Sequence, residues 1–207
     1  MDHIKALVDR IPALAVCEAD IRRATDLMET AYRNGGKLLL CGNGGSAADC
    51  EHISGELLKG FLSLRTPDAA EQQKLQAAGF SAEEAQKLQG GIPAVPLTSL
   101  SAVLSAFAND VDPALVFAQL TYAMGGKADV LLGLSTSGNS GNVVSAAKAA
   151  KAVGMPSVAM TGEGGGKLSE ICDVTIRVPA KETYLVQEYH LPVYHAICSE
   201  LEERIFG

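Results

Sequence analysis

Residues 37–49 read KLLLCGNGGSAAD, a short apolar run that passes through a glycine-rich turn into a helix-favouring stretch. Four more short apolar segments follow, and helical patterns fit between most of them. The predicted strands are 37–41, 94–97, 130–134, 157–160 and 174–178. Because strands that alternate with helices form parallel sheets covered on both faces, the sequence predicts an α/β fold.

Helical segments flank and interrupt this pattern. Apolar spacing predicts two leading helices over 2–16 and 18–34, and a C-terminal helix over 182–205 that Pro192 would kink. The polar interval 60–93 contains two helix-start signals and predicts an inserted helical hairpin. The signals are Thr66-Pro67 and the capping box that begins at Ser81. The hairpin is interpreted either as an exposed insertion or as a lid over a pocket.

Bulk composition limits the class of protein. A chain of 207 residues with 47% hydrophobic content fits a single domain, here 1–207, and its net charge of -7 argues against a nucleic-acid partner. No apolar run is long enough to span a membrane. Five cysteines without a CxxC pair indicate neither a disulfide framework nor a structural zinc knuckle, so a reducing cytoplasm is expected.

Two strand-to-helix turns carry the main functional signal. They are Gly42–Ser46, and Ser135–Asn142 with its run of hydroxyl and amide side chains. Both should lie at the carboxyl ends of strands, where open α/β sheets bind ligands. Glycines allow close backbone approach, and helix N-termini favour anions, so the pair predicts phosphate binding rather than two capped helix starts. Neither turn matches a P-loop or a dinucleotide fingerprint.

Titratable residues follow on two helices. His52 and Glu56 are four residues apart and therefore share one helix face. His190 and His195 lie in the C-terminal helix, where spacing alone favours half-buried, hydrogen-bonded histidines. Asn109-Asp110 by itself fits a helix end and turn.

Taken together, several stretches resemble the phosphoheptose isomerases of the sugar isomerase (SIS) domain family. They are CGNGGSAADCEH with the following Glu56, the turn at Asn109-Asp110, LLGLSTSGNSGNVVSAAKAAK and QEYHLPVYH. The resemblance covers about 1–59 and 94–207. It implies a flavodoxin-like parallel sheet and a homotetramer that is assembled through the helices of 1–35, with active sites near subunit interfaces. It also implies conversion of sedoheptulose 7-phosphate to D-glycero-D-manno-heptose 7-phosphate.

The resemblance also assigns roles to residues. The family's substrate contacts fall on Asn43, Gly44, Gly45, Ser46, Glu56, Asn109, Asp110, Ser135, Thr136, Ser137, Ser140 and Gln187. Its metal ligands, for one zinc ion per subunit, fall on His52, Glu56, Gln187 and His195. Isomerisation through an enediol needs a base and a partner acid, and Glu56 and His195 are the expected catalytic pair.

Some features depart from the family pattern. Lys59 stands near the position of a usual arginine, Tyr184 replaces an acidic or polar residue, and the interval 60–93 is longer than usual. Eight residues of helix place Gln187 and His195 about 12 Å apart. Two alternatives stay open: a non-catalytic SIS module that binds a phosphosugar or a protein, such as a replication initiator-associating protein, and an isomerase of another ketose phosphate.

Overall fold

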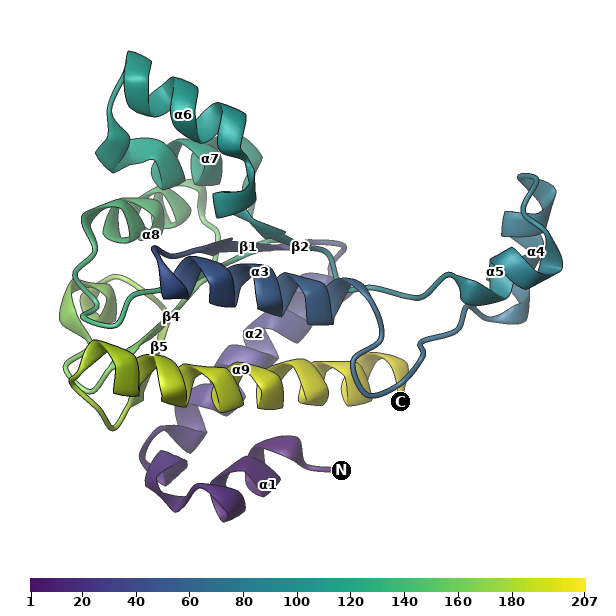
Figure 1. Ribbon diagram of the computed structural model, residues 1–207, viewed down its shortest axis with the longest axis horizontal. Coiled ribbons are helices and arrows are strands. Elements are labelled where there is room, and N and C mark those ends of the chain that lie inside the picture. Colours follow the sequence, from purple (N-terminus) through teal and green to yellow (C-terminus); the bar gives the residue numbers. More distant parts are fainter.

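The computed structural model describes all 207 residues and has a five-stranded parallel sheet at its centre (Figure 1). The strands are β1 (Leu38–Cys41), β2 (Ala94–Pro96), β3 (Val130–Leu134), β4 (Ser157–Gly162) and β5 (Val174–Val178). Their order is β2-β1-β3-β4-β5. After β1 the chain continues to the edge strand β2, and after β3 it continues through β4 to the opposite edge strand β5. The predicted α/β fold and parallel sheet are confirmed, and the ligand-binding switch point lies between β1 and β3.

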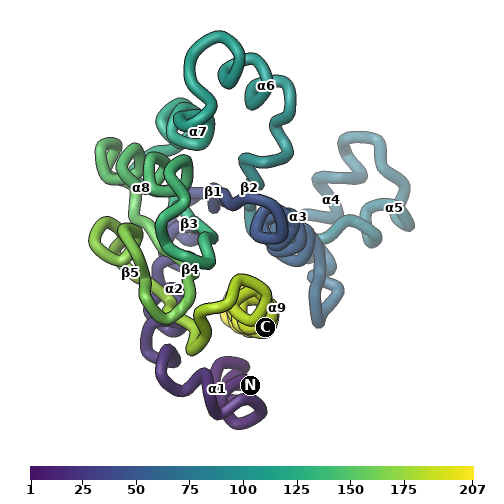
Figure 2. Tube along the Cα trace, turned by 60° about the vertical axis from the view of Figure 1, so that its left-hand side comes forward, coloured from purple at the N-terminus to yellow at the C-terminus, as the bar shows by residue number.

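Alternating strand residues build a core on each face of the sheet. Leu38 and Leu40 belong to the larger apolar cluster, whereas Leu39 and Cys41 face the smaller one. The helices α2 (Glu18–Arg33), α3 (Gly45–Leu58) and α9 (Thr183–Phe206) contribute to the larger cluster, and α7 (Val116–Met124) and α8 (Gly141–Val153) to the smaller. Figure 2 shows α7 and α8 on one side of the strands and α2 and α9 on the other.

The first predicted helix is shorter than expected. α1 spans only His3–Arg10, and a 3-10 helix covers Pro12–Cys17. Pro12 disfavours helical geometry in the residue before it, and Ile11 has φ -129° and ψ 79°. The second helix ends as predicted, because Asn34 caps it and Gly35 takes the left-handed conformation at φ 73°.

The C-terminal helix is continuous, although a kink was predicted. α9 runs through Pro192 and shows no sharp bend in Figure 1. The proline removes the hydrogen bond that would end on the carbonyl of Glu188. Glu188 is exposed, so water can satisfy that carbonyl without bending of the helix.

The interval 60–93 forms an arm that projects from the body (Figure 1). It carries α4 (Ala69–Ala77) and α5 (Ala82–Lys87), as the predicted hairpin requires. The capping box at Ser81 and Glu84 is present. The Thr66-Pro67 start is wrong, because the Asp68 side chain accepts the backbone N–H of Glu71 and α4 begins after it.

A buried ion pair anchors the start of this arm to α9. Glu202 accepts backbone N–H groups from Phe61, Leu62 and Ser63, at 2.7–3.1 Å, and pairs with Arg65 Nε at 2.6 Å. The Arg65 side chain is fully buried, and its guanidinium also donates to the carbonyls of Leu57 and Glu56. The arm is thereby joined to both α3 and α9.

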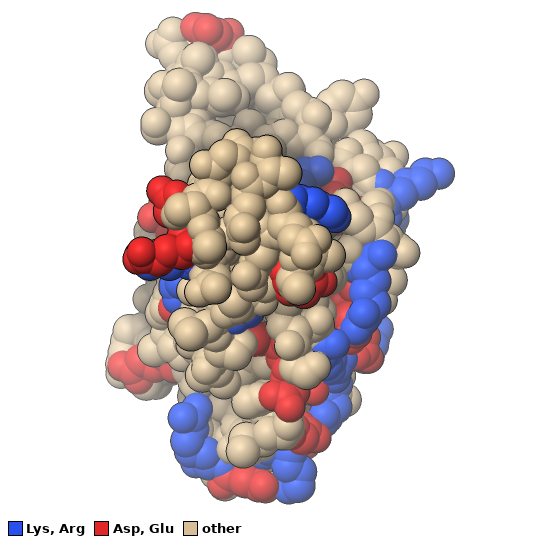
Figure 3. All heavy atoms as spheres, turned by 90° about the vertical axis from the view of Figure 1, so that its right-hand side faces the viewer, with Lys and Arg blue, Asp and Glu red and all other residues tan.

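The surface includes one helix without any buried residue, and side chains of both charges. α6 (Ser101–Asp110) has no buried residue and stands apart from α3 and α9 in Figures 1 and 2. On the face shown in Figure 3, basic side chains run down one side with acidic side chains next to them, and uncharged residues cover most of the rest. None of the helices combines the length and the hydrophobicity that a membrane span requires.

Candidate active site

Helices α3 and α9 lie side by side and run in the same direction (Figure 1). At their N-terminal ends, the Gln187 side chain packs against Gly45 so closely that a Cβ there would lie 2.6 Å from Nε2. About two turns further along both helices, the rings of His52 and His195 meet with centroids 5.0 Å apart. Because α3 and α9 are parallel, residues from two distant stretches of sequence lie opposite one another in a row along the two helices.

The row contains a cluster of three predicted site residues. His52 Nε2 lies 3.3 Å from Glu56 Oε1, and the His52 and His195 rings meet edge to face. Phe61, at the start of the arm, covers His195 with ring centroids 5.5 Å apart. The structure therefore brings together His52, Glu56 and His195, as the sequence predicted.

Charge and burial set the protonation of this cluster. Burial alone would raise the pKa of Glu56, but the hydrogen bond and charge of Lys59, together with His52, outweigh it and lower that pKa. Lys59 Nζ lies 2.7 Å from Glu56 Oε2. Burial, with the charges of His52 and Arg10, lowers the pKa of His195. At neutral pH the cluster thus holds an ionised carboxylate on Glu56 and a neutral imidazole on His195, two groups suited to proton transfer.

The nitrogen and oxygen atoms of the predicted metal ligands are compatible with zinc, although the four side chains do not all converge on one point. No three His, Cys, Asp or Glu side chains converge closely enough in this structure to hold a metal ion. His52 Nε2 and Glu56 Oε1 are nevertheless 3.3 Å apart, and two ligands of a tetrahedral zinc ion at about 2.0–2.1 Å lie about 3.3–3.4 Å apart. His195 Nε2 is buried without a hydrogen-bond partner. The fourth expected ligand, Gln187, lies instead at Gly45.

The first glycine-rich turn starts α3 and contacts the second turn. Gly44 has φ 56° and ψ -122°, a backbone conformation that side chains disfavour, which explains the glycine. Asn43 and Asn142 exchange two amide hydrogen bonds of 2.9 Å. Ser46 is buried. The two turns therefore form one wall at the carboxyl ends of β1 and β3.

The second turn presents hydroxyl groups in a fixed arrangement. Ser135 is buried, and its Oγ lies 2.9 Å from Ser140 Oγ at the start of α8. Ser137 is exposed, and its Oγ accepts the backbone N–H of Asn139, so its own proton is free to donate to a ligand. Gly138 has φ 67°, and a Cβ there would overlap the backbone of Gly165. This close approach holds the turn in place.

Two predicted substrate contacts lie elsewhere. Asn109 and Asp110 end α6, as the spacing suggested, and both are exposed. The Asn109 amide donates to Asp110 Oδ1 at 2.8 Å. α6 stands apart from α3, which carries His52, and from α9, which carries His195, in both views (Figures 1 and 2).

Sequence reasoning missed three residues that support the site. Asn142 pairs with Asn43, and Tyr194 Oη contacts both His52 Nδ1 and Asp49 Oδ1. Only the spacing of Asp49 and His52 on one helix hinted at a shared environment, because contacts between helices have no local signature.

His190 differs from the half-buried, hydrogen-bonded histidine that was expected. It is fully buried, and its ring faces the backbone of Thr161 without forming a hydrogen bond of normal geometry. Burial lowers the pKa of His190 to about 4. It is neutral at physiological pH and lies in the core rather than in the cluster.

We expect His190 to make the fold sensitive to acid. Its pKa is about 4 in the folded state and about 6.5 in the unfolded chain, so the unfolded state binds more protons between these values. Stability therefore falls as pH drops from about 6.5 to about 4, by about 3 kcal/mol from this group. Urea denaturation of the wild type and of His190→Leu at several pH values measures it. If the free energy of unfolding depended on pH in the same way in both proteins, His190 would not be the source of this acid sensitivity.

Comparison with known proteins places the chain in a family. The profile of the SIS domain matches residues 1–87 and 76–162. A phosphoheptose isomerase of Halorhodospira halophila is 39% identical over 209 residues, covering 100% of this chain and 92% of that protein. The phosphoheptose isomerase of Rhodospirillum rubrum is 36% identical over 208 residues, covering 99% of this chain and 98% of that protein.

Solved structures give the same result. The phosphoheptose isomerase of Neisseria gonorrhoeae matches with a TM-score of 0.72 and 33% identity, covering 96% of this chain and 91% of that one. That of Francisella tularensis matches with a TM-score of 0.76 and 28% identity, covering 96% and 94%. With identity above 30% over nearly the full length of both proteins, the chain belongs to the phosphoheptose isomerase family of SIS-domain proteins.

Proposed function

We propose that the protein converts sedoheptulose 7-phosphate to D-glycero-D-manno-heptose 7-phosphate through an enediol. The observation that carries this proposal is the cluster between α3 and α9, in which His52 contacts both an ionised Glu56 and a neutral His195. Family membership supports the reaction, and the hydroxyl-lined turn at Ser135–Ser140 supports a phosphorylated substrate.

The proposed chemistry assigns one proton transfer to each member of the pair. Glu56 removes a proton from C1 of the ketose and returns it to C2, which leaves an aldehyde at C1. His195 carries the accompanying proton from the C1 hydroxyl to the C2 oxygen, so charge and atoms balance. The turn at Ser135–Ser140 holds the phosphate, and Asn43 to Ser46 line the sugar with Gln187. Fixing the distant phosphate orients the reacting carbons.

We propose that His52, Glu56 and His195 also hold one zinc ion, with Gln187 as the fourth expected ligand. Their nitrogen and oxygen donors suit zinc, and the unpartnered Nε2 of His195 supports the proposal. When bound, the ion would polarise the substrate carbonyl and stabilise negative charge on the oxygens.

We propose further that the protein acts as a homotetramer with active sites near subunit interfaces, where Asn109 and Asp110 join the site of a neighbour. The exposed apolar residues of α6 support this, because no residue of α6 is buried within one protomer. Val103 is 43% exposed, and Val111 beyond the helix end is 65% exposed.

We expect Ser137→Ala to weaken substrate binding. Loss of one hydrogen bond to a charged phosphate removes about 1.5–3 kcal/mol, so KM should rise about tenfold or more while kcat changes little. Steady-state kinetics with sedoheptulose 7-phosphate measures both. Ser169→Ala is the control, because its exposed hydroxyl donates to the Gly166 carbonyl. An unchanged KM for the Ser137 variant would contradict the proposed phosphate contact.

A panel of ketose phosphates with five to seven carbons tests the substrate assignment. We expect the highest kcat/KM for sedoheptulose 7-phosphate. A higher value for a shorter ketose phosphate would reassign the substrate. Tight binding of a protein partner or of all sugar phosphates without turnover would indicate a non-catalytic module.

A further inference from the structure

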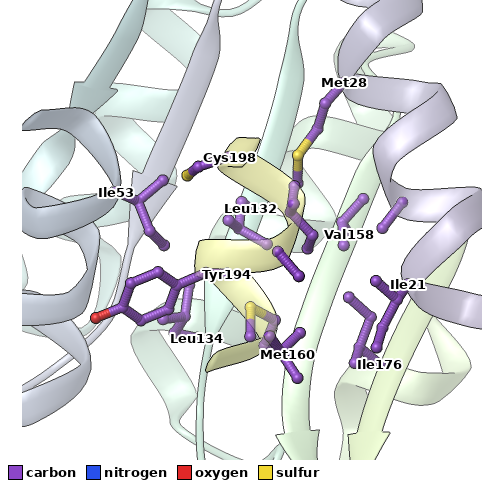
Figure 4. Close-up of a cluster of buried hydrophobic side chains, with 14 of the residues drawn as sticks. Ile21, Met28, Ile53, Leu132, Leu134, Val158, Met160, Ile176, Tyr194 and Cys198 are labelled. Carbon is purple, nitrogen blue, oxygen red and sulfur yellow. The ribbon is translucent and has the colours of Figure 1, made fainter. Parts of the chain in front are cut away.

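A cavity of about 340 Å³ lies between α1, α9 and the start of the arm. Figures 1 and 2 show α9 between α3 and α1. In Figure 4 the side chains of Tyr194 and Cys198 point from α9 toward Ile53 of α3. His195 and Ser199 are each one position further along α9, so they lie on the neighbouring face of the helix, where they line the cavity. The cavity therefore adjoins the reacting end of the proposed site.

The lining of this cavity is basic, although the net charge of the protein is -7. It includes Arg10 and two histidines, and no aspartate or glutamate. Two acidic residues that follow on α9 are paired with other arginines, Glu200 with Arg204 at 2.9 Å and Glu202 with Arg65 at 2.6 Å. The cavity thus offers positive charge without a carboxylate of its own, which is a suitable environment for an anion.

Arg10 has no partner within the chain, in contrast to other charged side chains of α1. Lys5 pairs with Asp9 at 2.7 Å, and His3 Nε2 lies 3.8 Å from Glu203. Arg10 is exposed, and its guanidinium forms neither an ion pair nor a hydrogen bond with another residue. Its N–H groups are therefore free, and the planar fork of a guanidinium matches a phosphate with two parallel hydrogen bonds.

The cavity lies at the opposite end of the proposed site from the hydroxyl-lined turn at Ser135–Ser140. That turn is joined to the start of α3 by the hydrogen bonds between Asn142 and Asn43. Seven residues of helix separate Gly45 from His52, which corresponds to about 10 Å. A sugar that extends from the turn to the His52 cluster places C1 at the cluster, so a group attached to its O1 would reach the cavity beyond.

We propose that this cavity is a second phosphate-binding site with Arg10 as its cation. It takes either free inorganic phosphate or the 1-phosphate of a ketose bisphosphate whose other phosphate occupies Ser135–Ser140. The bisphosphate case rests on the proposed function, whereas the site at Arg10 does not. A ketose with a phosphorylated O1 has no O1 proton to give up, so it cannot form an aldehyde at C1. Such a ligand is therefore an inhibitor of the proposed reaction.

Nuclear magnetic resonance of the purified protein locates the anion directly. The Nε–H signal of an arginine side chain responds to a bound phosphate, and its loss in Arg10→Gln assigns the signal of Arg10. We expect a saturable shift of this signal when the wild type is titrated with inorganic phosphate or with sedoheptulose 1,7-bisphosphate. A shift with inorganic phosphate identifies the free anion as a ligand, and a shift with the bisphosphate alone identifies the second phosphate of a sugar. If neither ligand shifts the signal, the inference is wrong.

Affinity provides the second measurement, by calorimetry with reduced sugars that cannot isomerise. We expect the wild type to bind heptitol 1,7-bisphosphate about tenfold or more tightly than heptitol 7-phosphate, because a hydrogen bond between charged groups contributes about that much. Arg10→Gln should remove most of this preference. Lys5→Gln is the matched control, since it removes the same charge from α1 outside the cavity, and the preference should stay within about twofold of the wild type.

The outcomes separate this inference from the proposed function. Weaker binding of inorganic phosphate or of the bisphosphate to Arg10→Gln would support the site even in a protein that does not isomerise sedoheptulose 7-phosphate. If Arg10→Gln kept the wild-type affinity for both ligands, the inference would be overturned, whether or not the wild type turned over the substrate.

Discussion

Glu56→Gln is expected to lower kcat by about 10²–10⁴-fold, the usual contribution of a general base. The amide cannot accept a proton from C1, and it also loses the charge that a metal ligand needs. KM should change far less, because the phosphate contacts are untouched. The measurement is initial-rate kinetics with sedoheptulose 7-phosphate, after thermal unfolding has shown that the variant folds.

Glu51→Gln is the matched control for this experiment. Glu51 lies on the same helix, is exposed, and accepts a hydrogen bond from Ser99 at 3.1 Å, away from the cluster. Its activity should stay within about twofold of the wild type, since changes at exposed sites seldom matter. Retention of wild-type kcat in Glu56→Gln would exclude Glu56 as the base.

Glu202→Ala is expected to lower the free energy of unfolding by about 3–5 kcal/mol, a large share of a typical total of about 5–15 kcal/mol. The substitution leaves the fully buried Arg65 side chain without its carboxylate and removes the acceptor for three backbone N–H groups of the arm. Urea denaturation measures the loss. Because Phe61 is one of those three residues and covers His195, we also expect some loss of activity.

The neighbouring Glu203→Ala serves as the control. Glu203 is exposed and contacts the N-terminal ammonium group and His3, so its removal should lower the free energy of unfolding far less than removal of Glu202 does. The double variant Arg65→Met with Glu202→Leu should recover part of the loss, because no buried charge is left unpaired. A loss below about 1 kcal/mol for Glu202→Ala would show that the ion pair does not anchor the arm.

The sheet was predictable because its signals are local. Each strand is a short apolar run, which the sequence shows directly. Leu38 and Leu40 then alternate with Leu39 and Cys41 between the two apolar clusters, because successive side chains of a strand point to opposite faces. The strand-to-helix turns were predictable for the same reason, since glycines and hydroxyl residues mark them. The pairing of His52 with Glu56 follows from helical spacing alone.

The remainder depends on contacts between distant segments. The parallel register of α3 and α9 sets which of their residues meet, and no local pattern encodes it. It brings His195 to His52 and Tyr194 to Asp49, while Gln187 meets Gly45. Pro12 ended α1 early because backbone restriction before proline outweighed apolar spacing.

Turnover of sedoheptulose 7-phosphate by the purified wild-type protein, followed by proton NMR in D₂O, shows whether the protein is a phosphoheptose isomerase. We expect the anomeric signals of D-glycero-D-manno-heptose 7-phosphate to grow with time, with deuterium entering C2 to the extent that the proton on Glu56 exchanges with solvent. With Glu56→Gln we expect this growth to be at least about 100-fold slower. Absence of the aldose from the wild-type reaction, both with and without added zinc, would exclude isomerisation of sedoheptulose 7-phosphate as the function of this protein.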